Sequence, residues 1–580
     1  MKIFHSKIIQ IFLFSFCLFI FYYLYTGCIV GFGFPKWFIE IPIFSSLLWG
    51  LFLSHSNISY SRYLILPLVI TLSIYLIFPI FGEIIPAWDL YTSIGFHSAT
   101  LLALSIPGFL IKKAFLKKVY FLILLFLYLV PVLLLWSYFS ISHTWPQVDT
   151  LIAIWQTNSS ESWEYLSDHL SLSFIPILII FLGCIYFISN KLQYITYLSK
   201  TSYPILFSVL LIALSAELGF LSLDNPLCNL WNDTQAQLTQ YQKFKELQAS
   251  RKTNSHTLTI SSKSTPGLFV LVIGESENRK HMNAYGYSRD TTPWLSSQKE
   301  NPHFLRFKRP YSCYVQTVQS LSYALTSKNQ YNAVPTEQAI TLIEAAKAAG
   351  YETWWISNQT RYGIWDNPTT VIASESAHQI WVNQNAGETD KTNFYDAKIC
   401  NFLQDASFGK NALIIIHLMG NHRPYILRFP QEFNLYHGEN RNYDNYDNSI
   451  RYNDEVMRQI YETVRQKPNF QSLVYCSDHG EAIDEGLDHD ATNYTPSMTH
   501  IPFYMFFSDS YMQSYPGTIK NLQSHQESIF TNDLLFNTML GLMHIKLDGL
   551  YEPENDITST SYDSNPSRFR TLFGKKELSE

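Results

Sequence analysis

The sequence predicts a multi-span α-helical membrane domain followed by a soluble α/β domain, in which helices sandwich a mainly parallel sheet. Up to about Gly219 the chain is dominated by Leu, Ile, Phe and Tyr, whereas Asn, Gln, Asp, Lys and Arg become common after it. From Gly267 onward, short apolar runs alternate with segments of helical character, which is typical of α/β domains. A chain of 580 residues is also too long for a single hydrophobic core.

The first part of the chain contains a series of apolar segments that approach or exceed the roughly 20 residues needed to cross a bilayer. So many long apolar runs in succession are not typical of buried helices in a soluble protein. The first run is too long for a cleavable signal peptide and has no small-residue cleavage site. We expect seven spans, with five as the alternative because the second and fourth segments are short. The segments are Ile8–Val30, Trp37–Ser54, Tyr63–Phe81, Ala99–Ile111, Val119–Phe139, Leu170–Ile188 and Pro204–Phe220.

Charged residues in the connecting loops predict the orientation of these spans. Lys112, Lys113, Lys117 and Lys118 crowd one loop, and short loops rich in Lys and Arg remain in the cytoplasm. The loop at residues 140–169 has acidic residues but no Lys or Arg, so we expect it outside. With an odd number of spans, everything after Leu221 then faces the periplasm or the cell exterior. We assign residues 1–222 to the membrane domain, 223–266 to a connector with an amphipathic helix at Asn232–Ser250, and 267–580 to the soluble domain.

Charge and cysteine spacing limit the classes of molecule that the protein is expected to bind. The net charge of −6 argues against nucleic acid, and no basic arm with interleaved aromatic residues is present. The seven cysteines form no CxxC pair or closely spaced metal-binding set. Cys228, Cys313, Cys400 and Cys476 could pair in an extracytoplasmic domain, but we expect them to be mostly free, buried thiols.

The soluble domain is expected to be a sheet of continuous apolar strands separated by helices. Such strands indicate a mainly parallel sheet that is covered on both faces. The predicted strands are Leu268–Ile273, Glu352–Ile356, Leu413–Ile416 and Leu473–Cys476, and two of the intervening helices are Thr336–Ala348 and Asn448–Gln466.

Polar side chains follow each predicted strand. Glu275 follows the first, Ser357-Asn358-Gln359 the second, His417 and His422 the third, and the pair Asp478-His479 the fourth. The carboxyl ends of parallel strands meet at one edge of the sheet, which is where such domains carry their chemistry. Carboxylate and imidazole ligands suit Zn²⁺, so we expect a metal site at this edge.

The residues at these strand ends resemble the signature motifs of the phosphoethanolamine transferases of Gram-negative envelopes, which are inner-membrane relatives of the alkaline phosphatase and sulfatase superfamily. The resemblance covers essentially the whole soluble half, and the apolar half in front of it fits the layout of the family. Its motifs are Gly274–Ser276 with Tyr285–Pro293, Thr317–Leu321, His417–His422, Tyr446–Ile450 and Ser477–Glu481.

The resemblance implies a role for individual residues. Glu275, Asp478 and His479 match zinc ligands, and Thr317 matches a nucleophile that also ligates the metal. Histidines that hold the phosphoryl group are matched by His422 and His489, which could also transfer protons. We expect His417 either to contact substrate or to support the site from behind. In the outer loop, residues 156–161 with Asn158 and Glu161 resemble a segment that binds the ethanolamine head group.

The implied reaction is transfer of phosphoethanolamine from phosphatidylethanolamine to a lipopolysaccharide acceptor, either a core heptose or lipid A, through a covalent intermediate on Thr317. The resemblance also implies at least one Zn²⁺, with a second possible, and a multi-pass inner-membrane protein, expected to be a monomer, with a periplasmic catalytic domain. Cys313 has no thiol partner at positions 322 and 323, unlike the lipid A branch of the family. The runs Arg309–Tyr311 and Thr499–Phe503 are more similar to the core-heptose branch.

Three other functions differ from this one in the residues that they require. A sulfatase needs Pro and Arg near its nucleophilic Cys or Ser, and the run Cys313–Thr317 has neither. A phosphoglycerol transferase acting on periplasmic glucan would share the metal, the threonine and the membrane anchor. A non-catalytic membrane sensor with a phosphatase-like domain would not require Glu275, Thr317, Asp478 and His479 together.

Overall fold

The computed structural model describes residues 111–142, 146–157, 174–192, 225–254, 258–261, 264–359, 368–382, 395–438 and 441–580, with isolated positions before residue 111 and at residue 162. The chain divides into two compact units. One consists of Met1–Leu151 with His169–Ala236, and the other of Ile152–Asp168 with Gln237–Glu580.

The first unit contains two long apolar helices among its described residues, α5 (Ala114–Ser142) and α8 (Phe174–Leu192). They cover the predicted spans Val119–Phe139 and Leu170–Ile188. Within the part of the chain that the structure describes, the segment Ala114–Phe139 is the one helix that is long and apolar enough to cross a membrane. The other predicted spans lie wholly or largely outside the described residues.

Two further helices lie in segments that the sequence predicts to be a loop and a connector. Helix α6 (Val148–Gln156) lies in the predicted outer loop. Helix α10 (Pro226–Asn254) contains the helix predicted at Asn232–Ser250 and extends beyond both of its ends. It begins early because the Asn225 side chain accepts hydrogen bonds from the backbone N–H groups of Leu227 and Cys228, as an N-cap does.

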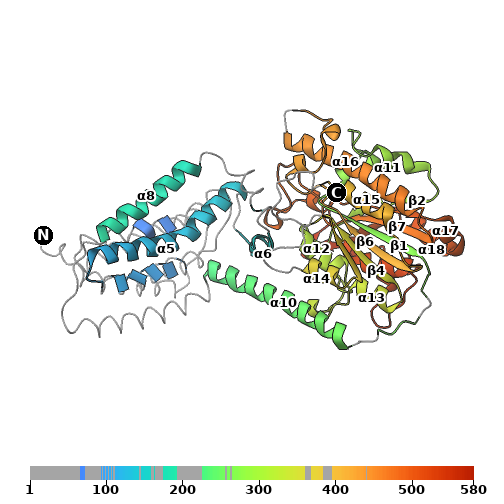
Figure 1. Ribbon diagram of the computed structural model, residues 1–580, viewed down its shortest axis with the longest axis horizontal. Coiled ribbons are helices and arrows are strands. Elements are labelled where there is room, and N and C mark those ends of the chain that lie inside the picture. Colours follow the sequence, from blue (N-terminus) through green and yellow to red (C-terminus); the bar gives the residue numbers. More distant parts are fainter. Residues whose placement is uncertain are drawn as a thin grey trace. The chain divides into compact units, whose positions relative to one another are not determined.

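The soluble domain is organised around a seven-stranded sheet (Figure 1). Five neighbouring strands are parallel to one another, as predicted. On one side of them the next strand runs antiparallel, and the edge strand beyond it reverses direction again. In spatial order the strands are β2 (Phe304–Arg306), β8 (Phe503–Phe507), β7 (Phe470–Ser477), β1 (Leu268–Gly274), β6 (Ala412–His417), β4 (Glu352–Ser357) and β5 (His378–Trp381).

Helices cover both faces of this sheet, because alternate side chains of each central strand point to opposite faces and both sets are apolar. Figure 1 shows the two layers on either side of the strands. One buried core includes residues of α12 (Thr317–Ala324), α13 (Leu342–Ala348), α14 (Pro368–Ser374), α17 (Asp509–Ser514), α18 (Pro516–Ser524) and α19 (Leu535–Leu542). The other includes residues of α11 (Pro293–Ser297), α15 (Ala397–Asp405) and α16 (Arg441–Val464).

The predicted helices end close to the observed last residues, but their observed first residues differ from the predicted ones. The segment predicted as one helix from Thr336 begins with a short 3-10 turn, and α13 starts only at Leu342. Thr341 and Glu344 form a capping box that fixes this start. Helix α16 starts seven residues before the predicted Asn448, at Arg441.

Two small sheets lie outside the main one. Strand β3 (Arg309–Tyr311) pairs in parallel with β9 (Ile529–Thr531). Strand β10 (Arg570–Thr571) pairs antiparallel with β11 (Lys576–Glu577).

Candidate metal centre

Two neighbouring strands bring the predicted ligands to one edge of the sheet. Strand β1 ends at Gly274, directly before Glu275, and β7 ends at Ser477, directly before Asp478. The strands pair in parallel, and Gly274 lies opposite Ser477. The residues that follow them therefore leave the sheet side by side, at the carboxyl ends of parallel strands, as expected from the sequence.

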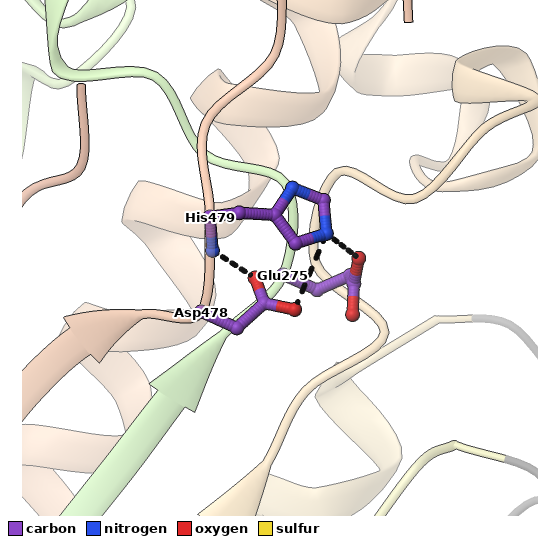
Figure 2. Close-up of side chains that lie close together, drawn as sticks. All are labelled: Glu275, Asp478 and His479. Atoms are coloured by element: carbon purple, nitrogen blue, oxygen red, sulfur yellow. Dashed lines mark hydrogen bonds and ion pairs between the residues drawn. The ribbon is translucent and has the colours of Figure 1, made fainter. Parts of the chain in front are cut away.

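Glu275, Asp478 and His479 form a buried cluster at this edge (Figure 2). Their carboxylate and imidazole ligand atoms all lie within 4.8 Å of one another. His479 Nε2 is 3.4 Å from Glu275 Oε1 and 3.4 Å from Asp478 Oδ2. Two carboxylates and one imidazole at this spacing make a donor set that suits Zn²⁺ and leaves a position for a fourth ligand.

Thr317 supplies a hydroxyl to the same cluster. It is the first residue of α12, and its Oγ1 lies 3.1 Å from Glu275 Oε2 and 3.3 Å from His479 Nε2. The residues that we expected to form the metal site thus converge, although they come from three separate stretches of the chain. The start of a helix carries partial positive charge, which favours a deprotonated oxygen there.

Two atoms in the cluster are prepared for a cation. Asp478 Oδ1 accepts hydrogen bonds from the backbone N–H groups of Ser276 and His479, at 3.1 and 2.7 Å. Asp478 Oδ2 is buried and has no hydrogen-bond partner among the described residues. His479 Nδ1 lies 2.8 Å from the Gly480 carbonyl, so it carries the ring proton and leaves the lone pair of Nε2 for a metal. These side chains fit a zinc ion.

The cluster also concentrates negative charge. Burial and the neighbouring Glu275 carboxylate raise the pKa of Asp478. Burial disfavours the charged form of His479, but the Asp478 and Glu275 carboxylates outweigh it and raise the pKa of the imidazole. Burial also opposes ionisation of Glu275, and the hydrogen bond and charge of His479 nevertheless hold its pKa below the usual range. A divalent cation would stabilise both carboxylates in their charged form.

Two side chains that we did not assign from the sequence hold Glu275 in place. Ser276 Oγ donates to Glu275 Oε1 at 2.9 Å, and the Ser276 backbone adopts a left-handed conformation with φ of 54°. Gln359 Nε2 donates to the Leu418 carbonyl at 2.9 Å and lies 3.3 Å from Glu275 Oε2. The position of Gln359 just after β4, at the same edge of the sheet, was the available indication of this role.

Asn532 links helix α12, which carries Thr317, to Asp478 at the end of strand β7. Its Oδ1 accepts from the Cys313 N–H at 2.8 Å, and its Nδ2 donates to Ser320 Oγ at 2.9 Å and to the Asp478 carbonyl at 2.7 Å. Ser320 Oγ donates to the same carbonyl at 2.7 Å. Nothing in the local sequence around Asn532 indicates this link.

The two histidines expected to hold a phosphoryl group lie beside the cluster. The ring of His489 is 4.4 Å from the ring of His479, centroid to centroid, and its Nδ1 is 3.2 Å from Glu481 Oε2. His422 Nδ1 lies 2.7 Å from the Arg423 carbonyl. Burial lowers the pKa of His422 to about 4, whereas the Glu481 carboxylate raises the pKa of His489 against the effect of burial.

An ion pair joins the two loops that carry these histidines. Arg423, next to His422, pairs with Asp488, next to His489. Both charged side chains are partly exposed, so the pair fixes the geometry of the loops more than it adds stability.

The remaining predicted substrate-binding residues differ in what the structure describes. His417 ends β6 at the same sheet edge, is buried, and packs edge-on against Trp355 with ring centroids 5.8 Å apart. Its Nε2 has no hydrogen-bond partner within the described ranges, and burial lowers its pKa to about 4. Asn158 and Glu161 lie outside the described residues.

Comparison with known proteins identifies similar families and structures. Residues 268–545 match the sulfatase family. The chain is 26% identical over 474 residues to phosphoethanolamine transferase EptC of Escherichia coli K12, a match that covers 74% of this chain and 80% of that protein. The chain is thus similar to a phosphoethanolamine transferase over most of its length. It is also 25% identical over 470 residues to phosphoethanolamine transferase CptA of Salmonella typhimurium LT2, with 74% of this chain and 80% of that protein covered.

Solved structures of phosphoethanolamine transferases share the fold. The crystal structure of the C-terminal periplasmic domain of Escherichia coli EptC in complex with Zn is 27% identical, covers 55% of this chain and 94% of that chain, and gives a TM-score of 0.50. The integral membrane protein EptA of Neisseria meningitidis, at 19% identity, covers 86% of this chain and 98% of that chain with a TM-score of 0.57. The predicted fold, a helical membrane domain followed by an α/β domain, is thereby confirmed, and the number of spans stays a prediction.

Proposed function

We propose that this transferase moves phosphoethanolamine from phosphatidylethanolamine to a lipopolysaccharide acceptor, a core heptose or lipid A, through a covalent intermediate on Thr317. One observation carries the proposal: the Thr317 hydroxyl lies 3.1 Å from Glu275 and 3.3 Å from His479, inside a buried set of metal-type ligands. The similarity to EptC and CptA supports phosphoethanolamine as the transferred group.

Glu275, Thr317, Asp478 and His479 would hold the zinc ion. A threonine hydroxyl is a weak nucleophile at neutral pH and requires activation. When bound, Zn²⁺ supplies positive charge that favours loss of the Thr317 proton. The likeness to the zinc complex of the EptC periplasmic domain supports this metal, and one ion satisfies the described ligands.

The reaction takes place in two displacements at phosphorus. Thr317 Oγ1 attacks the phosphorus of phosphatidylethanolamine, the bond to the diacylglycerol oxygen breaks, and diacylglycerol leaves after taking up a proton. An acceptor oxygen then attacks the phosphorus, loses its own proton, and releases Thr317. We assign His422 and His489 to orienting the phosphoryl oxygens and exchanging these protons. The ring contact of His489 with His479 and the charge interaction of His422 with Glu275 support this assignment.

The chemistry of the substrates fits the topology that the apolar segments and loop charges predict. Both donor and acceptor are lipids, so the catalytic domain is tethered beside the bilayer. We assign residues 1–222 to a membrane domain of seven spans in the bacterial inner membrane, 223–266 to the connector, and 267–580 to a monomeric periplasmic domain. Asn158 and Glu161 are assigned to the ethanolamine head group.

A labelling experiment tests the reaction. Full-length protein in detergent is mixed with phosphatidylethanolamine that carries a tag on its head group, and covalent label on the protein is measured. We expect label on the wild type and on Thr317→Ser, which keeps the hydroxyl, and none on Thr317→Ala. Label on a folded Thr317→Ala variant would contradict the assignment of the nucleophile.

Mass spectrometry of lipopolysaccharide identifies the acceptor. We expect phosphoethanolamine on core heptose or lipid A in cells that contain the protein, and its loss in cells that lack it. Phosphoglycerol on periplasmic glucan would favour the phosphoglycerol transferase alternative. An envelope unchanged in lipids and glycans would favour the sensor alternative.

A further inference from the structure

The segment Arg570–Glu580, called the strap from here on, contacts the chain on both sides of Thr317. It contains the small hairpin of β10 and β11. Its contacts reach the stretch Tyr311–Tyr323, which carries Thr317, and the loop that follows Glu275. No residue of the strap belongs to a motif identified in the sequence.

Phe573 of the strap lies between two tyrosines that flank Thr317. Its ring stacks on Tyr314 with centroids 4.4 Å apart and on Tyr323 with centroids 4.1 Å apart. Tyr314 lies three residues before Thr317, and Tyr323 lies on α12 six residues after it. The Phe573 ring thus contacts both the segment before Thr317 and helix α12, which begins at Thr317.

Hydrogen bonds to the backbone carbonyls of Ser312 and Cys313 hold the strap in an unusual conformation. Thr571 Oγ1 donates to the Ser312 carbonyl at 2.9 Å, and the Phe573 N–H donates to the Cys313 carbonyl at 3.2 Å. Leu572 and Phe573 both adopt left-handed conformations, with φ of 49° and 56°. Non-glycine residues rarely adopt this conformation, and it persists only where surrounding contacts enforce it. The contacts with Ser312, Cys313 and the two tyrosines provide that enforcement.

Glu580 connects the same stretch to the loop after Glu275. The Tyr311 hydroxyl donates to Glu580 Oε1 at 2.6 Å, and Arg279 Nη2 and Lys280 Nζ each lie 3.1 Å from Glu580 Oε2. Arg279 is buried and also donates to the Pro310 carbonyl at 2.6 Å. Partial burial raises the pKa of Glu580, but the hydrogen bond from Tyr311 and the charges of Arg279 and Lys280 outweigh it and hold the pKa below its usual range.

We propose that the strap is a positioning element that keeps Thr317 Oγ1 at its metal-ligand position, with Phe573 and Glu580 as its two anchors. Cys313, four residues before Thr317, is a free thiol, so no disulfide involving this cysteine braces the stretch. Phe573 and Glu580 act through the tyrosines and touch none of the zinc-type ligands in the contacts of the described residues. The kinetic consequence rests on the proposed transferase function, whereas the structural consequence does not.

The test combines hydrogen exchange with kinetics on full-length protein in detergent. Phe573→Leu keeps an apolar side chain but removes the stacking ring, and Phe573→Tyr keeps the ring. Lys575→Ala, an exposed change within the strap, is the matched control. Amide exchange of residues 311–323, bound zinc, and kcat and KM for tagged phosphatidylethanolamine are measured for each variant.

We expect Phe573→Leu to speed exchange in residues 311–323 and to lower kcat by about tenfold to a hundredfold, because small displacements of a reacting group reduce rates by this order. KM and zinc content stay at wild-type values, and Phe573→Tyr and Lys575→Ala behave as wild type. Glu580→Gln shows the same changes as Phe573→Leu to a smaller extent, since it keeps one acceptor for Tyr311.

Two results would overturn the proposal. One is wild-type exchange and kcat in Phe573→Leu. The other is faster exchange throughout the soluble domain with loss of zinc, which would indicate general destabilisation. If the wild type transfers no label, the proposed function fails, and exchange in residues 311–323 still decides whether the strap braces this stretch.

Discussion

Replacing Asp478 by Asn removes one ligand of the candidate zinc site while leaving the surrounding backbone bonded. In the wild type, Oδ1 accepts from two backbone N–H groups, and an amide oxygen can do the same. Oδ2, which has no hydrogen-bond partner within the described residues, becomes an amide nitrogen without a lone pair for the metal. The variant therefore tests metal binding with little change to the fold.

The expected size of the effect follows from the number of ligands lost. Mutation of groups that merely support metal ligands already weakens metal binding by about 10–100-fold, so loss of a buried ligand itself should weaken it by at least about 100-fold. With zinc at 100 times the wild-type Kd, binding stabilises the wild type by about 2.7 kcal/mol and the variant by about 0.4 kcal/mol. At about 2–4 °C per kcal/mol, zinc should raise Tm by about 5–10 °C in the wild type and by only about 1 °C in the variant.

The assay is thermal unfolding of full-length protein after removal of metal with a chelator, with and without added zinc. Asp509→Asn makes the same chemical change at an exposed carboxylate and should keep the full zinc-dependent shift. An equal shift in Asp478→Asn and wild type would refute the assignment of Asp478 as a ligand.

Three further predictions concern the support of the site and of the domain. Gln359→Leu removes a hydrogen-bond donor beside Glu275 and should weaken zinc binding by about 10–100-fold. Competition with a chelating dye measures this affinity, and an unchanged value would show that Gln359 does not support the zinc site. Burial raises the pKa of Asp454 to about 7, above the pKa of this group in the unfolded chain, so the stability contributed by its neutral form is lost as pH rises from about 4 through 7. Asp454→Asn does not ionise and should therefore flatten the loss of unfolding free energy over this window. An unchanged pH profile of the unfolding free energy would contradict this prediction. Thr341→Ala breaks the capping box with Glu344 and should lower the unfolding free energy by about 0.5–2 kcal/mol in denaturant titrations, with a change near zero as the contrary result.

The strand ends could be predicted because the information is local. Each central strand is a short apolar run, and the residue that follows it is placed by the parallel register of the sheet. Glu275, Asp478 and His479 could therefore be brought together from sequence pattern alone. Thr317 lies on no strand, and its assignment depended on the resemblance to a known family.

The contacts that brace the site could not be predicted in this way. Asn532 bonds residues more than 50 positions away, and Phe573 stacks on rings about 250 positions away. Periodicity carries no information about such pairings, because they depend on how whole elements pack. The start of α13 is a different case: the Thr341–Glu344 capping box is visible in the sequence, but the preceding residues have helical composition and obscured it.

Peptide mass spectrometry of the protein after brief exposure to phosphatidylethanolamine tests the central claim most directly. The account predicts a phosphoethanolamine group on the peptide that contains Thr317, formed with zinc present, and removed when an acceptor lipopolysaccharide is added. A modification on another residue, or transfer to the acceptor with no modified Thr317 at any time, would contradict the claim that this threonine carries the group between two lipids.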